Sequence, residues 1–205
     1  SSVFFNGAAH IQHHYFFNLE NYEGKRNPEW YLNYREDPFR DTLFFYNELI
    51  GEYLKLNQNI LILTGLSQIP YNFQKFYYRL QDPSKFLDLL NIKHSKVQSR
   101  MTRDFLIEFN NNDDAQSALK KLSQLKDKNG VKLFEELDLR EKSIFATFTY
   151  PHEIKNELLI HFENIIIDIK KLITFVALKN GMHDSKGFAF TNLDNIFETN
   201  SKFQL

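Results

Sequence analysis

In the first hundred residues, some segments place apolar residues with the period of a strand and others with the period of a helix. Residues 2–6 form a short apolar run that predicts a strand, and residues 10–18 follow as a predicted helix. Asp37 and Pro38 precede apolar residues spaced for one helical face, which predicts a helix that begins there. The continuous apolar run before Gly65 is typical of a buried parallel strand. The order strand, helix, helix, strand predicts an α/β layer.

The pattern changes at about residue 100. We expect strands at 104–109, 131–135 and 143–149, and a helix at 113–126. Together these elements resemble a small ferredoxin-like α+β subdomain. The sequence therefore predicts three parts, which are an α/β segment at 1–99, an α+β insertion or cap at 100–150, and a return to the α/β layer at 151–205.

The apolar stretch 162–178 and a last strand at 187–191 complete the α/β layer. If this organisation is right, residues 3–6, 60–64 and 174–178 share one sheet.

Composition narrows the class of protein. The 205 residues, 42% of them hydrophobic, suffice for one large domain or two small ones. The net charge of −1 comes from scattered charges, which argues against a nucleic-acid partner. The sequence has no Cys, so disulfides and thiolate metal sites are excluded. It has no apolar run of about 18 residues, so we expect no membrane span in this chain.

The chain opens without Met on the apolar residues Val3, Phe4 and Phe5. We interpret it as part of a longer protein, in which an N-terminal half packs against the sheet edges.

Histidines supply the most informative chemistry. His10, His13 and His14 lie within five residues, and His183 follows far downstream in a loop between Gly181 and Gly187. Neutral imidazole is the commonest protein ligand of Zn²⁺. A shared ion would bring the ring nitrogens to within about 4–5 Å of one point. The alternative is that the three early histidines are ordinary half-buried residues of an aromatic-rich helix.

Several segments resemble the C-terminal half of the alkaline phosphatase superfamily, in its type I phosphodiesterase/nucleotide pyrophosphatase-like branch. Ala9 and His13, or His10 and His14, stand where the family has Asp and His four residues apart. The helix with Asn47 stands for the family's Tyr-Asp helix, and residues 64–67 stand for its Ser-Asp-His-Gly motif. Residues 181–183, followed by Gly187, match its late Gly-x-His loop.

The resemblance implies a metal-dependent hydrolase of small phosphoric (phosphodiester or phosphomonoester) or sulfuric esters. His13, His14 and His183 would bind Zn²⁺ or another divalent metal, with His10 supporting them. The family's second metal site loses its Asp and His, since Thr64, Gly65, Leu66 and Ser67 stand there. The nucleophile is expected upstream of this chain. The alternative is a non-catalytic binding or scaffolding domain that keeps the fold.

The segment after the predicted insertion offers polar groups that suit a choice of substrate. Tyr150 and His152 flank Pro151, which fixes the chain direction. We expect these two side chains to shape specificity without taking part in the chemistry.

Overall fold

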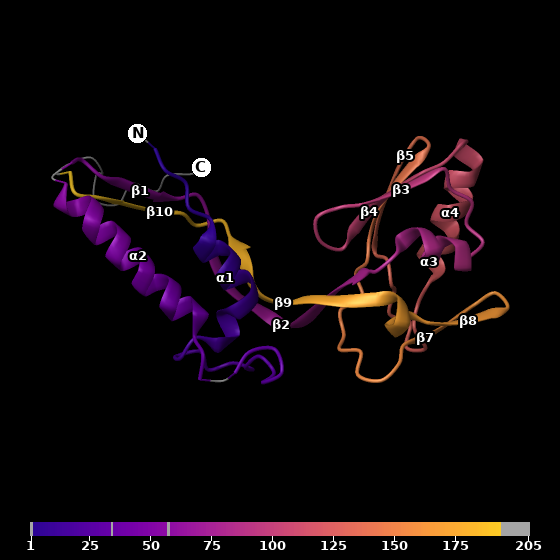
Figure 1. Cartoon of the computed structure of the whole chain (residues 1–205), viewed down its shortest axis with the longest axis horizontal. Coiled ribbons are helices and arrows are strands. Elements are labelled where there is room, and N and C mark those ends of the chain that lie inside the picture. The colour runs from indigo at the N-terminus through magenta and orange to yellow at the C-terminus, as the bar shows by residue number, and fades with distance from the viewer. Residues whose placement is uncertain (1, 34, 57, 194–205) are drawn as a thin grey trace. The chain divides into compact units, whose positions relative to one another are not determined.

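The computed structural model describes residues 2–33, 35–56 and 58–193 and divides the chain into two compact units. The first unit joins residues 1–74 to 178–205, and the second unit is residues 75–177. The chain passes from one to the other within strand β2 (Ser67–Leu80) and returns within β9 (Ile173–Asp184). These two strands pair with each other (Figure 1). The second unit is thus an insertion in the first, and it is longer than the expected 100–150.

Two helices begin the first unit. Helix α1 (Gly7–Tyr15) continues as the 3₁₀ turn η1 (Phe16–Asn18). Helix α2 (Pro38–Lys55) has Pro38 in its first turn, and the Asp37 side chain accepts a hydrogen bond from Arg40 N at 2.9 Å. The start of this helix, predicted from Asp37 and Pro38, is confirmed, because the cap satisfies a backbone donor that the helix leaves free.

The strands of the first unit pair differently from the expectation. Strand β1 (Leu61–Thr64) pairs antiparallel with β10 (Phe188–Thr191), so the predicted parallel pairing is wrong. Residues 3–6 form no regular element, and residues 174–178 belong to the β2–β9 pair. The three segments therefore do not share one sheet. The apolar pattern found β1, but its partner lies more than a hundred residues away, which local periodicity cannot specify.

The second unit contains a four-stranded antiparallel sheet in the order β3-β4-β6-β5. The chain forms α3 (Pro83–Leu89), β3 (Lys96–Ser99), β4 (Asp104–Glu108), α4 (Asn112–Gln124), β5 (Glu136–Arg140) and β6 (Ser143–Thr147). The hairpin β7 (Leu159–Phe162) with β8 (Ile165–Asp168) and the turn η2 (Ile169–Leu172) follow. Strand β2 precedes α3, so the order of elements along the chain matches the ferredoxin-like order β-α-β-β-α-β, but β2 pairs with β9 and is not part of this sheet, whereas the strands of a ferredoxin-like unit share one sheet.

Large aromatic side chains fill the core of the second unit. Phe134 is 1% exposed, and its ring contacts those of Phe86, Phe105 and Phe148 at centroid distances of 5.6–6.1 Å. Helix α4 buries Ala115, Ala118 and Leu122 against the sheet. This unit therefore has a hydrophobic core of its own.

The first unit exposes many of its apolar side chains. Among the described residues, its buried apolar side chains are those of Phe17, Phe39 and Leu178. Large apolar side chains are exposed on α2, β1 and β10: Leu43, Phe44, Phe45, Tyr53, Leu54, Leu61, Leu63, Phe188 and Phe190. Neither α2 nor any other helix in the described part of the chain has the length and apolar character needed to cross a membrane. The structure thus confirms a mixture of helices and strands, with the apolar surface concentrated in one unit.

Candidate functional site

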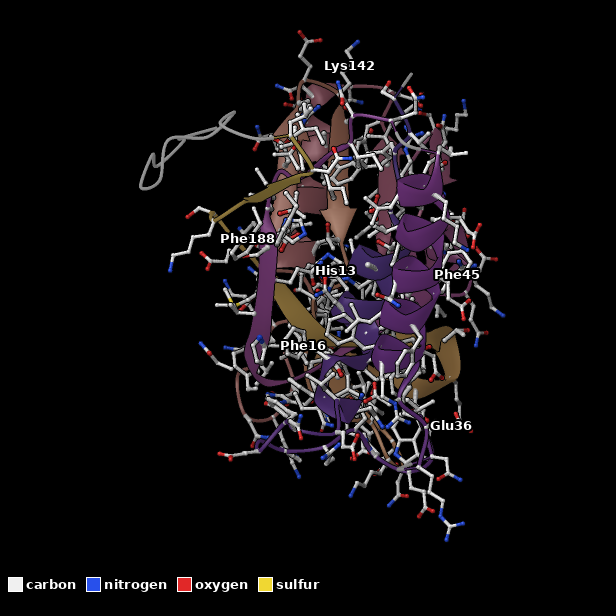
Figure 2. All side chains as sticks on the ribbon, turned by 90° about the vertical axis from the view of Figure 1, so that its left-hand side faces the viewer. His13, Phe16, Glu36, Phe45, Lys142 and Phe188 are labelled. Carbon is white, nitrogen blue, oxygen red and sulfur yellow. The ribbon has the colours of Figure 1, made fainter. Side chains whose placement is uncertain are left out.

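His13 occupies the middle of the first unit. It lies near the C-terminal end of α1, and in the view of Figure 2 it lies between α2, which carries Phe45, and the ribbon that carries Phe188. Its Nδ1 is 3.2 Å from the carbonyl oxygen of Gly181 in β9. Because a carbonyl can only accept, Nδ1 carries the proton and Nε2 keeps its lone pair.

His183 lies directly against His13. The two Nε2 atoms are 2.9 Å apart, and the ring centroids are 4.9 Å apart. With Nε2 of His13 unprotonated, this contact is a hydrogen bond donated by Nε2 of His183. The structure therefore brings together two histidines that are 170 residues apart in the sequence.

Burial and neighbouring charge favour the neutral form of His13. Burial lowers the pKa of His13 below its ordinary value, and the neighbouring His183, His14 and Lys179 lower it further. The hydrogen bond to the Gly181 carbonyl acts in the opposite direction. The net effect keeps a neutral imidazole at this position near pH 7, which is the form that binds metal.

His14 and His10 have different surroundings. The Nδ1 of His14 is 3.1 Å from the carbonyl oxygen of Leu178, so this ring too is held in place by a hydrogen bond to the backbone of β9. Its ring centroid is 6.5 Å from that of His13. His10 is exposed on the same helix. Within the described residues, no three His, Asp or Glu side chains gather closely enough to share an ion.

A buried asparagine cluster beside the histidines was not singled out by the sequence analysis. Asn180 is completely buried, and its Oδ1 accepts hydrogen bonds from Phe17 N at 2.9 Å and from Asn27 Nδ2 at 2.7 Å. Asn27 Nδ2 also donates to Asn18 Oδ1. These bonds attach the end of α1 to β9. Asn180, Gly181 and His183 all belong to β9, so the expectation that His183 lies in a loop is wrong. Nothing in the sequence of this stretch distinguishes a buried amide from an exposed one.

Tyr150 belongs to the core of the second unit. It is 6% exposed, and its hydroxyl donates to Asp127 Oδ2 at 3.1 Å. Burial and the neighbouring Asp127 raise its pKa to about 12. His152 is exposed, and its ring packs edge-on against Tyr150. The expectation that Tyr150 reaches a substrate is corrected, because its polar group is used inside the unit's own core.

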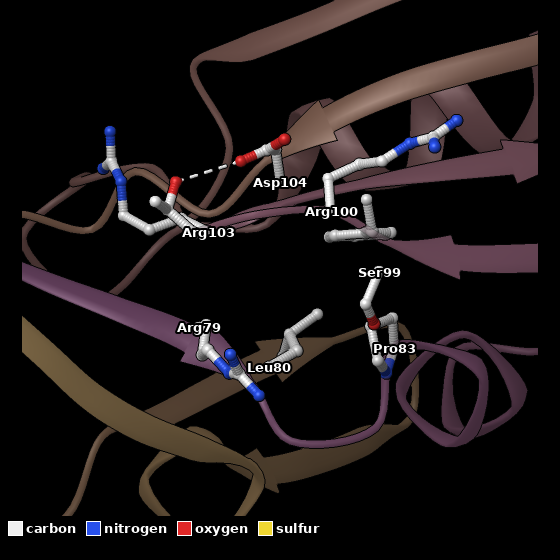
Figure 3. Close-up of a pocket in the computed structure, with 9 residues that line it drawn as sticks. Arg79, Leu80, Pro83, Ser99, Arg100, Arg103 and Asp104 are labelled. Carbon is white, nitrogen blue, oxygen red and sulfur yellow. Dashed lines mark hydrogen bonds between the residues drawn. The ribbon is translucent and has the colours of Figure 1, made fainter.

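A pocket of the second unit is lined by residues that include Arg79, Arg100, Arg103 and Asp104 (Figure 3). The Arg103 guanidinium lies 3.8 Å from the centre of the Tyr77 ring and donates to the Phe148 carbonyl. Arg100 and Arg103 extend to opposite sides of Asp104. The positive charges do not meet at one point, so we assign no ligand to this pocket.

Comparison with known proteins adds no relative. No protein-family model, no curated protein and no solved structure matches the chain.

Proposed function

We propose that the first unit is the metal-binding part of a hydrolase of phosphoric or sulfuric esters, similar in function to the alkaline phosphatase superfamily. The observation that carries the proposal is the contact between His13 and His183. Two nitrogen ligands of a tetrahedral zinc ion, with bonds of about 2.0–2.1 Å, lie about 3.3 Å apart. The separation of 2.9 Å between the two Nε2 atoms is close to that value.

The hydrogen bonds behind the rings also fit a metal site. Metal-binding histidines usually donate their second ring N–H to a carbonyl or carboxylate, which fixes the ring and its tautomer. His13 does so to Gly181, and His14 does so to Leu178. His13 and His183 would hold Zn²⁺ or another divalent metal, with His10 as a supporting residue. His14 would become a further ligand only if its ring, whose centroid is 6.5 Å from that of His13, turned toward them. Such an ion supplies Lewis-acid polarisation of an ester oxygen.

The second candidate function is a non-catalytic binding or scaffolding domain. Thr64, Gly65, Leu66 and Ser67 offer no carboxylate or imidazole where the family has the ligands of its second ion. Paired ions stabilise both the attacking and the leaving oxygen, so a site with one ion loses part of that stabilisation. This observation favours binding without turnover.

The exposed apolar side chains of α2, β1 and β10 support a partner for the first unit. A ribbon of two strands is marginally stable alone, and apolar patches above a few hundred Å² usually mark an interface. We infer that an N-terminal segment of the same protein packs there. Adding that segment should lower the exposure of Phe188 and Phe190 to hydrogen-exchange or labelling probes, and unchanged exposure would contradict the inference.

The hydrolase proposal is tested by metal binding and turnover together. We expect Zn²⁺ or Mn²⁺ to bind in calorimetry, and His13→Ala and His183→Ala each to abolish binding. His161→Ala is the matched control, because His161 is exposed on β7 of the other unit. Turnover is assayed in the full-length protein, because the nucleophile is expected upstream of this chain. Turnover of an aryl phosphate, phosphodiester or sulfate that disappears in His13→Ala supports an enzyme. Metal binding without turnover supports the non-catalytic domain. Wild-type protein that binds neither Zn²⁺ nor Mn²⁺ contradicts the assignment of His13 and His183 as metal ligands.

A further inference from the structure

Gln68 of β2 contacts the helical turn that carries His13. Its Nε2 donates to the carbonyl oxygen of Ala9 at 3.2 Å. In an α-helix the carbonyl of one residue accepts the N–H of the fourth residue after it, so the Ala9 carbonyl is also the helical acceptor for His13. Gln68 therefore binds the backbone group that positions His13 within α1.

Three segments meet at Gly181 with no room for a side chain. A Cβ on Gly181 would lie 2.5 Å from Gln68 Oε1 and 2.7 Å from the carbonyl oxygen of Gln12. Both distances are below the approach that carbon and oxygen atoms tolerate. The absence of a side chain lets β9 approach α1 closely at the point where the Gly181 carbonyl accepts from His13.

The amide of Gln68 is only half satisfied. Its Oε1 is buried and has no hydrogen-bond partner among the described residues. An unsatisfied buried oxygen destabilises the folded protein, and an apolar side chain of the same length would avoid that loss. Stability therefore does not explain a glutamine at this position, whereas the bond from Nε2 to Ala9 does.

We propose that Gln68 is a positioning residue for His13. Its bond to Ala9, together with the close approach at Gly181, holds α1 on β9 so that Nδ1 of His13 meets the Gly181 carbonyl and Nε2 meets His183. The effect of Gln68 on the orientation of His13 concerns the protein without metal. Its consequence for metal affinity rests on the proposed function.

The test uses the full chain with ¹⁵N-labelled histidine, observed by NMR at pH 8 without metal. Wild-type His13 should show one tautomer, with the proton on Nδ1. Gln68→Met keeps the length of the side chain but removes the donor, and should give a mixture of both tautomers. The matched control is Gln58→Met, because Gln58 is an exposed glutamine of the same unit. The control should keep the wild-type spectrum.

Zinc titration and thermal unfolding complete the test. Loss of an interaction that orients a ligand typically lowers metal affinity about 10–100-fold. We expect a loss of about tenfold in Gln68→Met with an unchanged or slightly higher melting temperature. Gly181→Ala should give the same mixture of tautomers, because the added Cβ separates β9 from α1.

The outcomes separate the two proposals. A single His13 tautomer in Gln68→Met overturns the positioning role, as does unfolding of the first unit in that variant, because Gln68 would then be a structural residue. Wild-type protein that binds no zinc overturns the proposed function, and the NMR spectra still decide the role of Gln68.

Discussion

The two units bury different kinds of side chain. The second unit packs rings such as Phe134 and Phe148 together with aliphatic residues in a continuous core. The first unit buries the polar side chains of Asn18, Asn27, Asp37 and Asn180, while many of its apolar side chains are exposed. The second unit is therefore held mainly by apolar burial, and the first mainly by directional hydrogen bonds.

This difference shows where sequence changes should matter. In an apolar core the cost of a substitution follows the volume removed, because the space left behind is only partly refilled. In a buried polar network the cost follows the number of groups that lose their partners. The same residue type can therefore be critical in one unit and nearly neutral in the other.

The largest effect is expected in the aromatic core. Phe134→Ala should lower the free energy of unfolding by about 3–5 kcal/mol in urea denaturation followed by circular dichroism. Phe190→Ala in the first unit should change it by less than about 0.5 kcal/mol, since Phe190 is 64% exposed. Equal losses of unfolding free energy in the two variants would contradict the conclusion that apolar burial stabilises mainly the second unit.

The next effect concerns the polar network. Asn180→Ala removes the acceptor of Phe17 N and leaves Asn27 without one of its partners. We expect a loss of about 2–3 kcal/mol. The fluorescence of Trp30, the single Trp of the chain and a residue of the first unit, should report it during urea denaturation. Asn72→Ala, at an exposed position of β2, is the control and should leave the transition unchanged.

Tyr150 tests the core of the second unit through pH. Its pKa is about 12, above the value of about 10 expected for an unfolded chain. The unfolded state therefore releases this proton first, and the stabilisation, complete below pH 10, is lost as the pH rises through 12. Tyr150→Phe should lower the free energy of unfolding by about 1 kcal/mol at pH 7. Between pH 10 and 12, the free energy of unfolding of this variant should decline less than that of the wild type. Parallel pH profiles for the two proteins would show that Tyr150 does not contribute to the decline.

The smallest effect belongs to a surface ion pair. Arg40 Nη1 lies 2.9 Å from Glu20 Oε2, and both side chains are largely exposed. Arg40→Ala should change the free energy of unfolding by less than about 0.5 kcal/mol, with less difference still in 1 M salt. A loss above about 1 kcal/mol would show that charge pairs also hold the first unit together.

Local signals predicted the helices better than the sheets. Asp37 with Pro38 located the start of α2, and the pattern that predicted a helix at 113–126 located α4. The strand at 61–64 was found, but its antiparallel partner at 188–191 depends on contacts across the whole inserted unit. Residues 131–135 were expected as a strand, whereas the strand begins at Glu136.

The candidate site shows the same difference between what local sequence signals predict and what depends on contacts between distant residues. The spacing of the histidines raised the possibility of a cluster, and the meeting of His13 with His183 is a geometric fact that spacing alone could not supply. The roles of Asn180 and Gln68 had no sequence signal, because the residue type does not show whether an amide side chain is buried or exposed. Tyr150 was misplaced because a polar side chain next to Pro151 looks the same whether its hydroxyl faces solvent or Asp127.

Strand β9 has a consequence for insertions and deletions. It contributes Ala177 to one unit and Leu178 to the other without a loop between them. Side chains of a strand point to alternate faces, so losing one codon in this stretch shifts one half of the strand by a residue relative to the other. Either Asn180 and Gly181 keep their places on α1, or Ile173 and Ala177 keep theirs in the second unit. Most exposed loops tolerate such a change in length. In β9 it should instead disrupt the strand pairing or packing of one of the two units.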